Sequence, residues 1–286
     1  MEQAIRDRYH DRIIGQARQR YGIRGFELEP LDGFESFMYL FRKGDAEFIL
    51  RIAHSIRRSA NMIRGELDWI NYLHHRGVRV ARAVTSVNNK LVEVIADGQG
   101  GQFLATAFVK APGSPPGPID NWSTEFIVHY GRVIGRMHAL SKHYHPSETS
   151  WRRPHWDDPI NLQTLAWLPA DQPLVAERAK STVDYLQSLP KAPKSYALIH
   201  QDAHAGNFYV DDTGNITLFD FDDAVYSWLI YDIAMVIFYA VTNTPHPKRA
   251  AARLWPYFWR GYCFENQLER ALLAQIPAFL KLREID

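Results

Sequence analysis

The residues with the greatest capacity for chemistry fall in two short segments. The first, His200-Gln-Asp-Ala-His-Ala-Gly-Asn207, places the carboxylate of Asp202 five residues before an amide. The second, Asp220-Phe-Asp-Asp223, adds three further carboxylates. Carboxylate and amide oxygens are the ligands that Mg²⁺ prefers. A carboxylate can also orient a hydroxyl group and accept its proton.

Transfer of a γ-phosphoryl group needs groups of this kind. Metal ions must neutralise charge on the β and γ oxygens, and a carboxylate must orient the attacking hydroxyl. Kinase catalytic loops have the same spacing between a basic Asp and a metal-binding Asn, followed by a metal-binding Asp in an Asp-Phe element. Each residue alone is also a common turn residue. The complete ordered string favours phosphoryl transfer over a set of unrelated turns.

The string His-x-Asp-x-His-x-x-Asn, followed by Phe-Asp-Phe-Asp-Asp-Ala, resembles the aminoglycoside phosphotransferase and choline kinase superfamily. This is the small-molecule branch of the protein-kinase-like fold. The resemblance implies that Asp202 is the catalytic base, that Asn207 and Asp220 bind Mg²⁺, and that ATP is the co-substrate. It also implies that Asp232 braces the catalytic loop, although a helix N-cap is an equally good interpretation. The chain departs from the family at Gln201, where relatives usually have Gly.

A cation and a carboxylate in the N-terminal half form a second expected pair. Arg51 interrupts the strongly β-forming run of residues 48–52, and Glu66 falls on the apolar stripe of a predicted helix. A carboxylate that faces the core needs a partner, and Arg51 is the obvious one. The resemblance assigns this pair to the nucleotide phosphates, although many relatives have Lys at the strand position. The alternative is an ordinary surface ion pair.

The resemblance also places the rest of a nucleotide site. Residues 32–37, with Ser36, correspond to the loop above the phosphates, although the loop contains only one glycine. Residues 106–109, which include Thr106 and Phe108, correspond to the hinge that contacts adenine through backbone groups. The alternative for this second segment is an edge strand that enters a linker.

The helices and strands expected around these residues indicate an α+β, protein-kinase-like fold with two lobes. Residues 111–118 contain four prolines and two glycines, which cannot continue a helix or a central strand. We therefore expect a small nucleotide-binding lobe over residues 1–107, with an antiparallel sheet and one helix. A hinge and linker over 108–118 follows, and then a larger, mainly helical catalytic and acceptor-binding lobe over 119–286.

Hydrophobic periodicity supports this division. Ser59 can cap the helix of the small lobe and Gly77 can end it. The later region is mostly helical, with a β interruption at residues 197–200, 207–210 and 216–221 and a hairpin turn at 211–215. In the small lobe, strands are expected at residues 37–42, 47–52, 91–95 and 103–108.

Composition excludes several classes of protein. The formal net charge of the 286 residues is only +1, so no global field favours nucleic acid or an anionic membrane. The apolar run of residues 229–241 is broken by Asp232 and is too short for a membrane span. One cysteine, Cys263, excludes an intrachain disulfide, and the charged start lacks a signal peptide, so we expect a cytoplasmic protein. The histidines, His138 among them, lack metal-ligand spacing and are expected at the surface or at helix ends.

Three hypotheses about function remain from the sequence. The first is a kinase for a hydroxyl of a small molecule such as an amino-alcohol, an amino acid or an aminoglycoside. The second is a protein Ser/Thr kinase of the bacterial stress-response type, since His-Ala-Gly-Asn and Asp-Asp-Ala occur there also. The third is a nucleotide-binding module without activity, which the presence of every required polar group disfavours.

Overall fold

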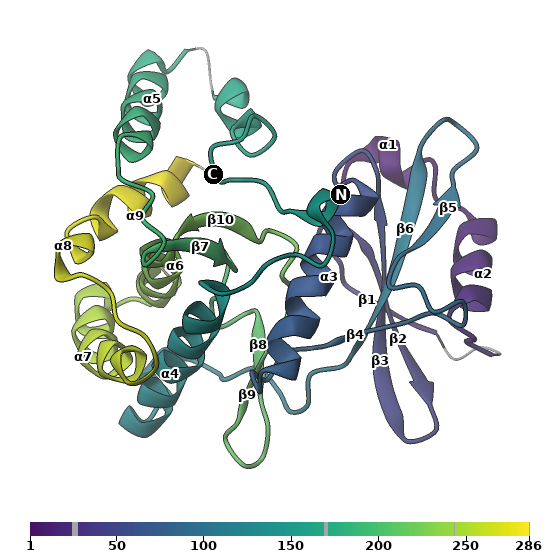
Figure 1. Ribbon diagram of the computed structural model, residues 1–286, viewed down its shortest axis with the longest axis horizontal. Helices are drawn as coiled ribbons and strands as arrows, with labels where there is room; N and C mark the ends of the chain where they lie inside the picture. The colour runs from purple at the N-terminus through teal and green to yellow at the C-terminus, as the bar shows by residue number, and fades with distance from the viewer. Residues whose placement is uncertain (25–27, 169–170, 243, 286) are drawn as a thin grey trace. The chain divides into compact units, whose positions relative to one another are not determined.

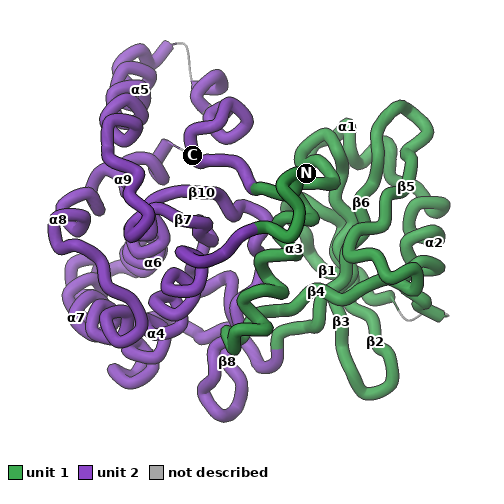
Figure 2. The backbone as a smooth tube through the Cα atoms, viewed as in Figure 1, with its two compact units in different colours: residues 1–111, 146–152 green, residues 112–145, 153–286 purple. Residues whose placement is uncertain are grey.

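The computed structural model describes residues 1–24, 28–168, 171–242 and 244–285, and the chain divides into two compact units (Figures 1 and 2). Unit 1 comprises Met1–Ala111 with Pro146–Arg152, and unit 2 comprises Pro112–His145 with Arg153–Asp286. The first boundary lies within the proline-rich segment. The sequence analysis had assigned residues 146–152 to the C-terminal region, whereas the structure groups them with unit 1.

Unit 1 is built on a six-stranded antiparallel sheet in the order β1-β2-β3-β6-β4, with β5 paired to β6 as well. Its central strand β3 pairs along its length with β2 and with β6, so that Arg51 lies between Met38 and Thr106. The strands are β1 (Glu29–Leu31), β2 (Phe37–Lys43), β3 (Ala46–His54), β4 (Ala83–Val84), β5 (Glu93–Ala96) and β6 (Gln102–Val109).

Helices cover the two faces of this sheet (Figure 1). Successive side chains of a strand point to opposite faces. Leu50 and Ile52 of β3 belong to one core together with α1 (Gln3–Arg6) and α2 (Asp11–Arg20). Arg51, between them, points to the other face and contacts α3 (Ala60–His75). The sequence predicted α3 alone, because α1 and α2 bury only a few apolar side chains amid many charges.

The predicted ends of α3 are confirmed. The Ser59 hydroxyl accepts the backbone N–H of Met62 at 3.2 Å, which satisfies one of the donors that a helix start leaves unpaired. Gly77 follows the last turn with φ 85°, a conformation that glycine adopts at little cost.

Unit 2 is largely helical, with two small two-stranded antiparallel sheets, β7–β10 and β8–β9. Its strands are β7 (Tyr196–Ile199), β8 (Phe208–Val210), β9 (Ile216–Leu218) and β10 (Val225–Trp228). Its α-helices are α4 (Thr124–Ser141), α5 (Pro173–Gln187), α6 (Leu229–Thr242), α7 (Pro247–Glu265), α8 (Arg270–Leu273) and α9 (Ile276–Ile285). Short 3₁₀ turns occur at Ile119–Asn121 and Gln163–Trp167 in this unit and at Thr149–Trp151 in unit 1.

Close contact between α4 and α7 depends on glycine. A Cβ atom at Gly131 would lie 2.1 Å from the carbonyl oxygen of Phe258, and one at Gly261 would lie 2.0 Å from that of Val128. Side chains at either position would force the two helices apart. Within the described ranges, no helix combines the length and the apolar character that crossing a membrane requires.

The predicted hairpin turn between β8 and β9 is also confirmed. One carboxylate oxygen of Asp211 accepts the backbone N–H groups of Thr213 and Asn215 at 3.0 and 2.9 Å. Such local side-chain bonds are the physical reason why Asp begins turns so often. Because β8 and β9 pair from Phe208 to Leu218, the hairpin returns the chain to the end of the loop that precedes β8.

Candidate active site

The loop that carries the predicted base connects β7 to β8 and is hydrogen-bonded to α6. Asp232 accepts the backbone N–H of His200 at 3.0 Å and that of Gln201 at 2.6 Å. The expected bracing role is therefore confirmed. The N-cap interpretation is wrong, because α6 begins at Leu229 and Asp232 lies fully buried in its first turn.

A buried chain of hydrogen bonds connects Asp232 to α4 and α7. His138 Nε2 lies 3.0 Å from a carboxylate oxygen of Asp232, and its Nδ1 lies 2.9 Å from the Tyr262 hydroxyl. Asn266 Nδ2 donates to the same hydroxyl at 2.6 Å, so the Tyr262 O–H is left to donate to His138. The expectation of a surface position for His138 is thus wrong. A signal was present: it follows the buried Ile134 by four residues on the apolar stripe of α4.

Gln201 adopts a backbone conformation that favours glycine. Its φ angle is 70°, in the left-handed region where a Cβ atom crowds the following carbonyl. This explains physically why relatives usually have Gly at the position. The Oε1 atom of Gln201 is buried and accepts no hydrogen bond from the described residues.

The carboxylate of Asp202 is oriented by its own loop. Asn207 Nδ2 donates to Asp202 Oδ2 and to the Asp202 carbonyl oxygen, both at 2.9 Å. His204 Nε2 lies 3.2 Å from the same Oδ2. Because His204 Nδ1 accepts the backbone N–H of Gly206 at 2.8 Å, the ring hydrogen resides on Nε2 and is donated to Asp202. The predicted base and the predicted metal ligand Asn207 therefore lie in direct contact.

A second element reaches the same carboxylate from far along the chain. Arg283 Nη2, on α9, lies 3.2 Å from Asp202 Oδ1 and also donates to the hydroxyl of Tyr239 on α6. The Tyr239 ring packs on His204 with 3.9 Å between ring centroids. Sequence reasoning found neither Arg283 nor Tyr239, and no spacing signal connects them to residues 200–207.

These contacts decide the ionisation of Asp202. Burial by itself raises the pKa of this carboxyl, but the hydrogen bond from His204 and the electrostatic interactions with His204, Arg283 and His200 outweigh burial and lower the pKa to about 2. The group is thus a carboxylate at neutral pH. It is suited to orienting a hydroxyl and accepting its proton late in a reaction, rather than to removing a proton from the free alcohol.

Oxygen atoms suited to a hard cation lie beside the carboxylate. Asn207 Nδ2 donates hydrogen bonds to Asp202, whereas Asn207 Oδ1 receives no hydrogen bond from any described residue. Phe219 N–H donates to the Asn207 carbonyl at 2.9 Å, and His200 Nε2 lies 3.0 Å from the Phe219 carbonyl oxygen. The β8–β9 hairpin therefore brings the backbone just before Asp220 back to the catalytic loop. The backbone of Asp220 has φ 62°. An amide oxygen and a carboxylate form a donor set that fits Mg²⁺.

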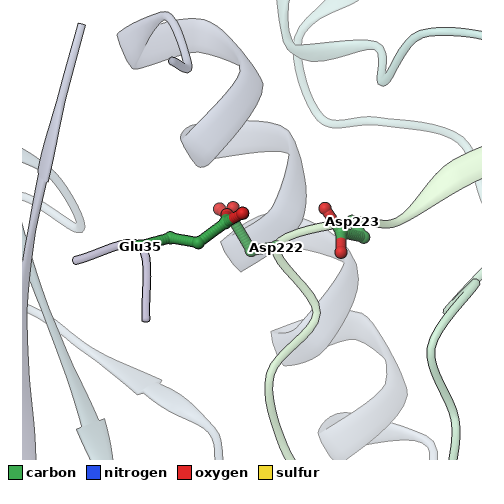
Figure 3. A group of neighbouring side chains, drawn as sticks. All are labelled: Glu35, Asp222 and Asp223. Carbon is green, nitrogen blue, oxygen red and sulfur yellow. The ribbon is translucent and has the colours of Figure 1, made fainter. Parts of the chain in front are cut away.

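Two further carboxylates follow Asp220 on the loop that leads to β10. Figure 3 shows the side chains of Asp222 and Asp223 projecting from this loop, with Glu35 of unit 1 also drawn. The loop backbone is fixed by Arg153, whose guanidinium donates to the carbonyl oxygens of Asp222 and Ala224 at 2.5 and 2.7 Å. Arg153 itself is buried.

In unit 1 the expected contact between Arg51 and Glu66 is confirmed. The guanidinium donates Nη1 and Nη2 to the two carboxylate oxygens of Glu66 at 2.9 and 2.6 Å, and both side chains are buried. This geometry is the bidentate fork that arginine forms and lysine cannot. The alternative of a surface ion pair is wrong. The role of the pair toward a nucleotide remains a prediction.

The other predicted nucleotide residues lie on or near the same sheet. Thr106 faces Arg51 across the β3–β6 pairing, and its hydroxyl donates to the Arg51 carbonyl at 3.4 Å. The Phe108 ring lies 5.0 Å from the Arg51 guanidinium. Ser36 lies in the loop before β2, where a Cβ atom at Gly33 would approach the Ser36 carbonyl oxygen to 2.1 Å. The single glycine of this loop is thus required by a tight turn.

Comparison with known proteins agrees with this fold. The solved structure of amicoumacin kinase hAmiN in complex with AMP-PNP, Ca²⁺ and Ami matches this chain at TM-score 0.94 and 33% identity. The match covers 100% of this chain and 86% of that one. It also matches the microcompartment-associated aminopropanol kinase over 96% of this chain and 87% of that one, at TM-score 0.77 and 23% identity. The fold is therefore that of the small-molecule kinases.

The sequence itself places the chain in a family. The model of the phosphotransferase enzyme family matches residues 27–273. Amicoumacin kinase of Bacillus subtilis (strain 168) is 37% identical over 97% of this chain and 83% of its own length. The chain belongs to the phosphotransferase enzyme family, and it is a kinase that acts on hydroxyl groups of small molecules.

Proposed function

We propose that this protein transfers the γ-phosphoryl group of ATP, with Mg²⁺, to a hydroxyl of a small molecule. The observation that carries the proposal is the arrangement at Asp202. Its ionised carboxylate is oriented by Asn207 and by His204, and the amide oxygen of Asn207 is left available beside it. The relative hAmiN, solved with an ATP analogue and a divalent cation, supports the choice of co-substrates.

In this mechanism each group has a separate task. Asp202 accepts a hydrogen bond from the acceptor hydroxyl. As that oxygen bonds to the γ-phosphorus, the bond to the β–γ bridging oxygen breaks, ADP leaves and the hydroxyl proton passes to Asp202. Asn207 and Asp220 would hold Mg²⁺, which supplies charge neutralisation at the phosphates.

The nucleotide is assigned to unit 1. Arg51, fixed by Glu66, is proposed to bind phosphate oxygens, and Ser36 to contact phosphate from the loop above. The backbone at Thr106 and Phe108 is proposed to meet the adenine. Support comes from the buried, bidentate Arg51–Glu66 pair, because a fixed guanidinium binds phosphate without first losing side-chain freedom.

The acceptor is proposed to be a small hydroxy compound of the antibiotic or amino-alcohol type rather than a protein. Support comes from the 37% identity with amicoumacin kinase, which extends over nearly the whole chain. Amicoumacin is therefore the first acceptor to test, followed by aminopropanol. Because ATP is abundant in the cytoplasm, we propose that compartment as the place of action.

The decisive experiment replaces the proposed base. Asp202→Asn keeps the size of the side chain but removes the proton acceptor, so phosphorylation of amicoumacin should fall by about 10³-fold. ADP release is measured with ATP and Mg²⁺, and nucleotide affinity is measured separately by calorimetry and should stay within the wild-type order of magnitude.

The matched control is Asp184→Asn, which alters an exposed carboxylate on α5 and should leave turnover unchanged. Removal of Mg²⁺ with a chelator should abolish turnover, and restoring the ion should recover it. Wild-type turnover in the Asp202 variant would contradict the proposed mechanism. A wild-type enzyme that binds nucleotide but phosphorylates neither acceptor would contradict the proposed acceptor class.

A further inference from the structure

The hydrogen-bonding capacity of the Asp202 carboxylate is nearly filled. A carboxylate offers about four acceptor positions, two on each oxygen. Oδ2 receives donors from Asn207 and His204 at 2.9 and 3.2 Å. Oδ1 receives Nη2 of Arg283 at 3.2 Å. The Tyr239 hydroxyl, to which Arg283 donates, also interacts with the Asp202 carboxylate. Arg283 and Tyr239 therefore border the less occupied oxygen, Oδ1.

Arg283 is itself held in place. Its guanidinium donates to the Tyr239 hydroxyl and lies 5.4 Å from the centre of the Tyr239 ring. That ring packs on His204, so the guanidinium, the tyrosine and the histidine form one continuous group around the carboxylate. The exposed fractions of the Arg283 and Asp202 side chains are only 21% and 19%. A contact this sheltered is screened little by solvent.

The helix that carries Arg283 is anchored in the core of unit 2. Phe279 of α9 is fully buried, stacks on Tyr231 with 5.2 Å between ring centroids, and lies 5.7 Å from the ring of Trp228. Phe279 and Arg283 are four residues apart and therefore lie on one face of α9. The core contact of the first residue thus sets the position of the second.

We propose that Arg283 is a positioning residue for phosphoryl transfer, which restrains the rotation of the Asp202 carboxylate so that Oδ1 faces the acceptor hydroxyl. The two donors on Oδ2 resist rotation of the carboxylate about the Cβ–Cγ bond. A donor on the other oxygen restrains this rotation further. The inference rests on the proposed function, because it assigns the direction from which the proposed base meets its substrate.

The proposal makes the last helix part of the catalytic apparatus. An error of about 1 Å in the position of a reacting group can cost about 10²-fold in rate. Loss of the Arg283 contact should therefore lower kcat, while the affinity for nucleotide, which the proposal assigns to unit 1, should not change. A residue with a purely structural role would instead lower the amount of folded enzyme and leave the kcat of the folded fraction intact.

The experiment compares Arg283→Gln, Arg283→Lys and the control Lys281→Gln, with amicoumacin, ATP and Mg²⁺. Lys281 is exposed on the same helix and carries the same charge, so its replacement controls for charge and helix propensity. We expect kcat to fall about 30-fold in Arg283→Gln. The KM for ATP should stay close to wild type and the variant should remain folded at the assay temperature, Arg283→Lys should recover part of the rate, and the control should match wild type.

Two further measurements keep the inference testable in every case. Tyr239→Phe removes the hydroxyl that holds the guanidinium and that also interacts with Asp202, so kcat should fall several-fold even if Arg283→Gln does not fold. A thermal-unfolding cycle with Asp202→Asn needs no acceptor: if Asp202 and Arg283 interact, the double variant should shift Tm by less than the sum of the single shifts.

The outcomes separate the two proposals. An unchanged kcat in Arg283→Gln, or in Tyr239→Phe, overturns the role of Arg283, as do additive Tm shifts in the cycle. If Asp202→Asn retains wild-type turnover, the proposed function fails instead, whatever Arg283 does. A loss of rate in Asp202→Asn with no loss in Arg283→Gln rejects this inference alone.

Discussion

Two residues at the candidate site have left-handed backbone conformations although neither is glycine. Gln201 precedes the proposed base with φ 70°, and Asp220 follows β9 with φ 62°. Such conformations cost of order 1 kcal/mol or more and persist where the surrounding contacts over-determine them. At Gln201 the determining contact is the backbone N–H donated to Asp232. The strain is thus held by the same bond that shapes the catalytic loop.

The variant Gln201→Gly should stabilise the protein. Glycine removes the left-handed strain and also removes a buried Oε1 that the described residues leave without a donor. The greater freedom of glycine in the unfolded chain opposes part of this gain. We expect the free energy of unfolding to rise by about 1 kcal/mol.

Urea denaturation measures this change, with Ala203→Gly as the matched control at a neighbouring position where φ is not left-handed. The control should lose stability. A decrease in the Gln201→Gly variant as well would show that the glutamine side chain contributes more by packing than it costs by strain.

Residue spacing predicted the parts of the site that lie close in the chain. Asp202 and Asn207 are joined by a loop of fixed length, so their contact follows from local sequence. Arg283 contacts Asp202 across 81 residues. No periodicity or motif records that contact, because it depends on how α9 packs. His138 is the intermediate case, since its helical stripe indicated burial but a polar side chain suggested the surface.

At the scale of elements, α6 connects the catalytic loop to the rest of unit 2. Asp232 accepts two backbone N–H groups of the loop on one side and faces His138 of α4 on the other. Tyr262 of α7 continues the chain of bonds. Three helices therefore share in holding one loop, through groups that are buried and hydrogen-bonded to one another.

Replacing the acceptor at the centre of this chain should disturb both stability and catalysis. In Asp232→Asn one oxygen becomes an N–H₂ group that faces a donor, which leaves a buried bond unmade. We expect a loss of about 3 kcal/mol in unfolding free energy and a fall in kcat, because the loop that carries Asp202 loosens. Asp184→Asn, at an exposed pair on α5, should change stability by less than about 0.5 kcal/mol. Equal stability of the two variants in urea would exclude the bracing role.

Elements with strong local signals were predicted well, and elements defined by tertiary packing were not. Ser59 and the turn at Asp211 act through side-chain bonds to nearby backbone, so local sequence determined α3 and the β8–β9 hairpin. In contrast α2 has mainly charged and other polar residues beside its few apolar ones and is fixed by Ile13 and Ala17 in the core of unit 1. Two small apolar groups do not form a visible stripe in such a sequence.

At the scale of the whole molecule, the near balance of 33 basic and 32 acidic residues coexists with strongly paired carboxyls inside each unit. In unit 1 the inaccessible Asp97 accepts Arg8 Nη1 at 2.6 Å and His54 Nε2 at 3.2 Å. It also accepts the N–H groups of Gln99 and Gly101 at 2.7 and 2.8 Å. The carboxylate thereby connects the turn that follows α1, the end of β3 and the β5–β6 turn.

These bonds give the stability of the protein a predictable dependence on pH. Burial raises the pKa of Asp97, but the N–H of Gln99 and the Arg8 guanidinium, with the other donors, lower it well below the ordinary value. A carboxyl whose pKa is lowered by folding contributes stability that is present above its unfolded pKa, about 3.9, and is lost as pH falls below it. At pH 7 Asp97→Asn should therefore be less stable than wild type by about 3 kcal/mol. The difference should shrink as the pH falls from 5 toward 3, which thermal unfolding at a series of pH values measures.

Asp45→Asn, in the exposed β2–β3 turn, serves as the control, and its stability should stay parallel to that of wild type at every pH. A constant gap between wild type and Asp97→Asn over that range would mean that the carboxylate charge contributes nothing and that only its shape matters.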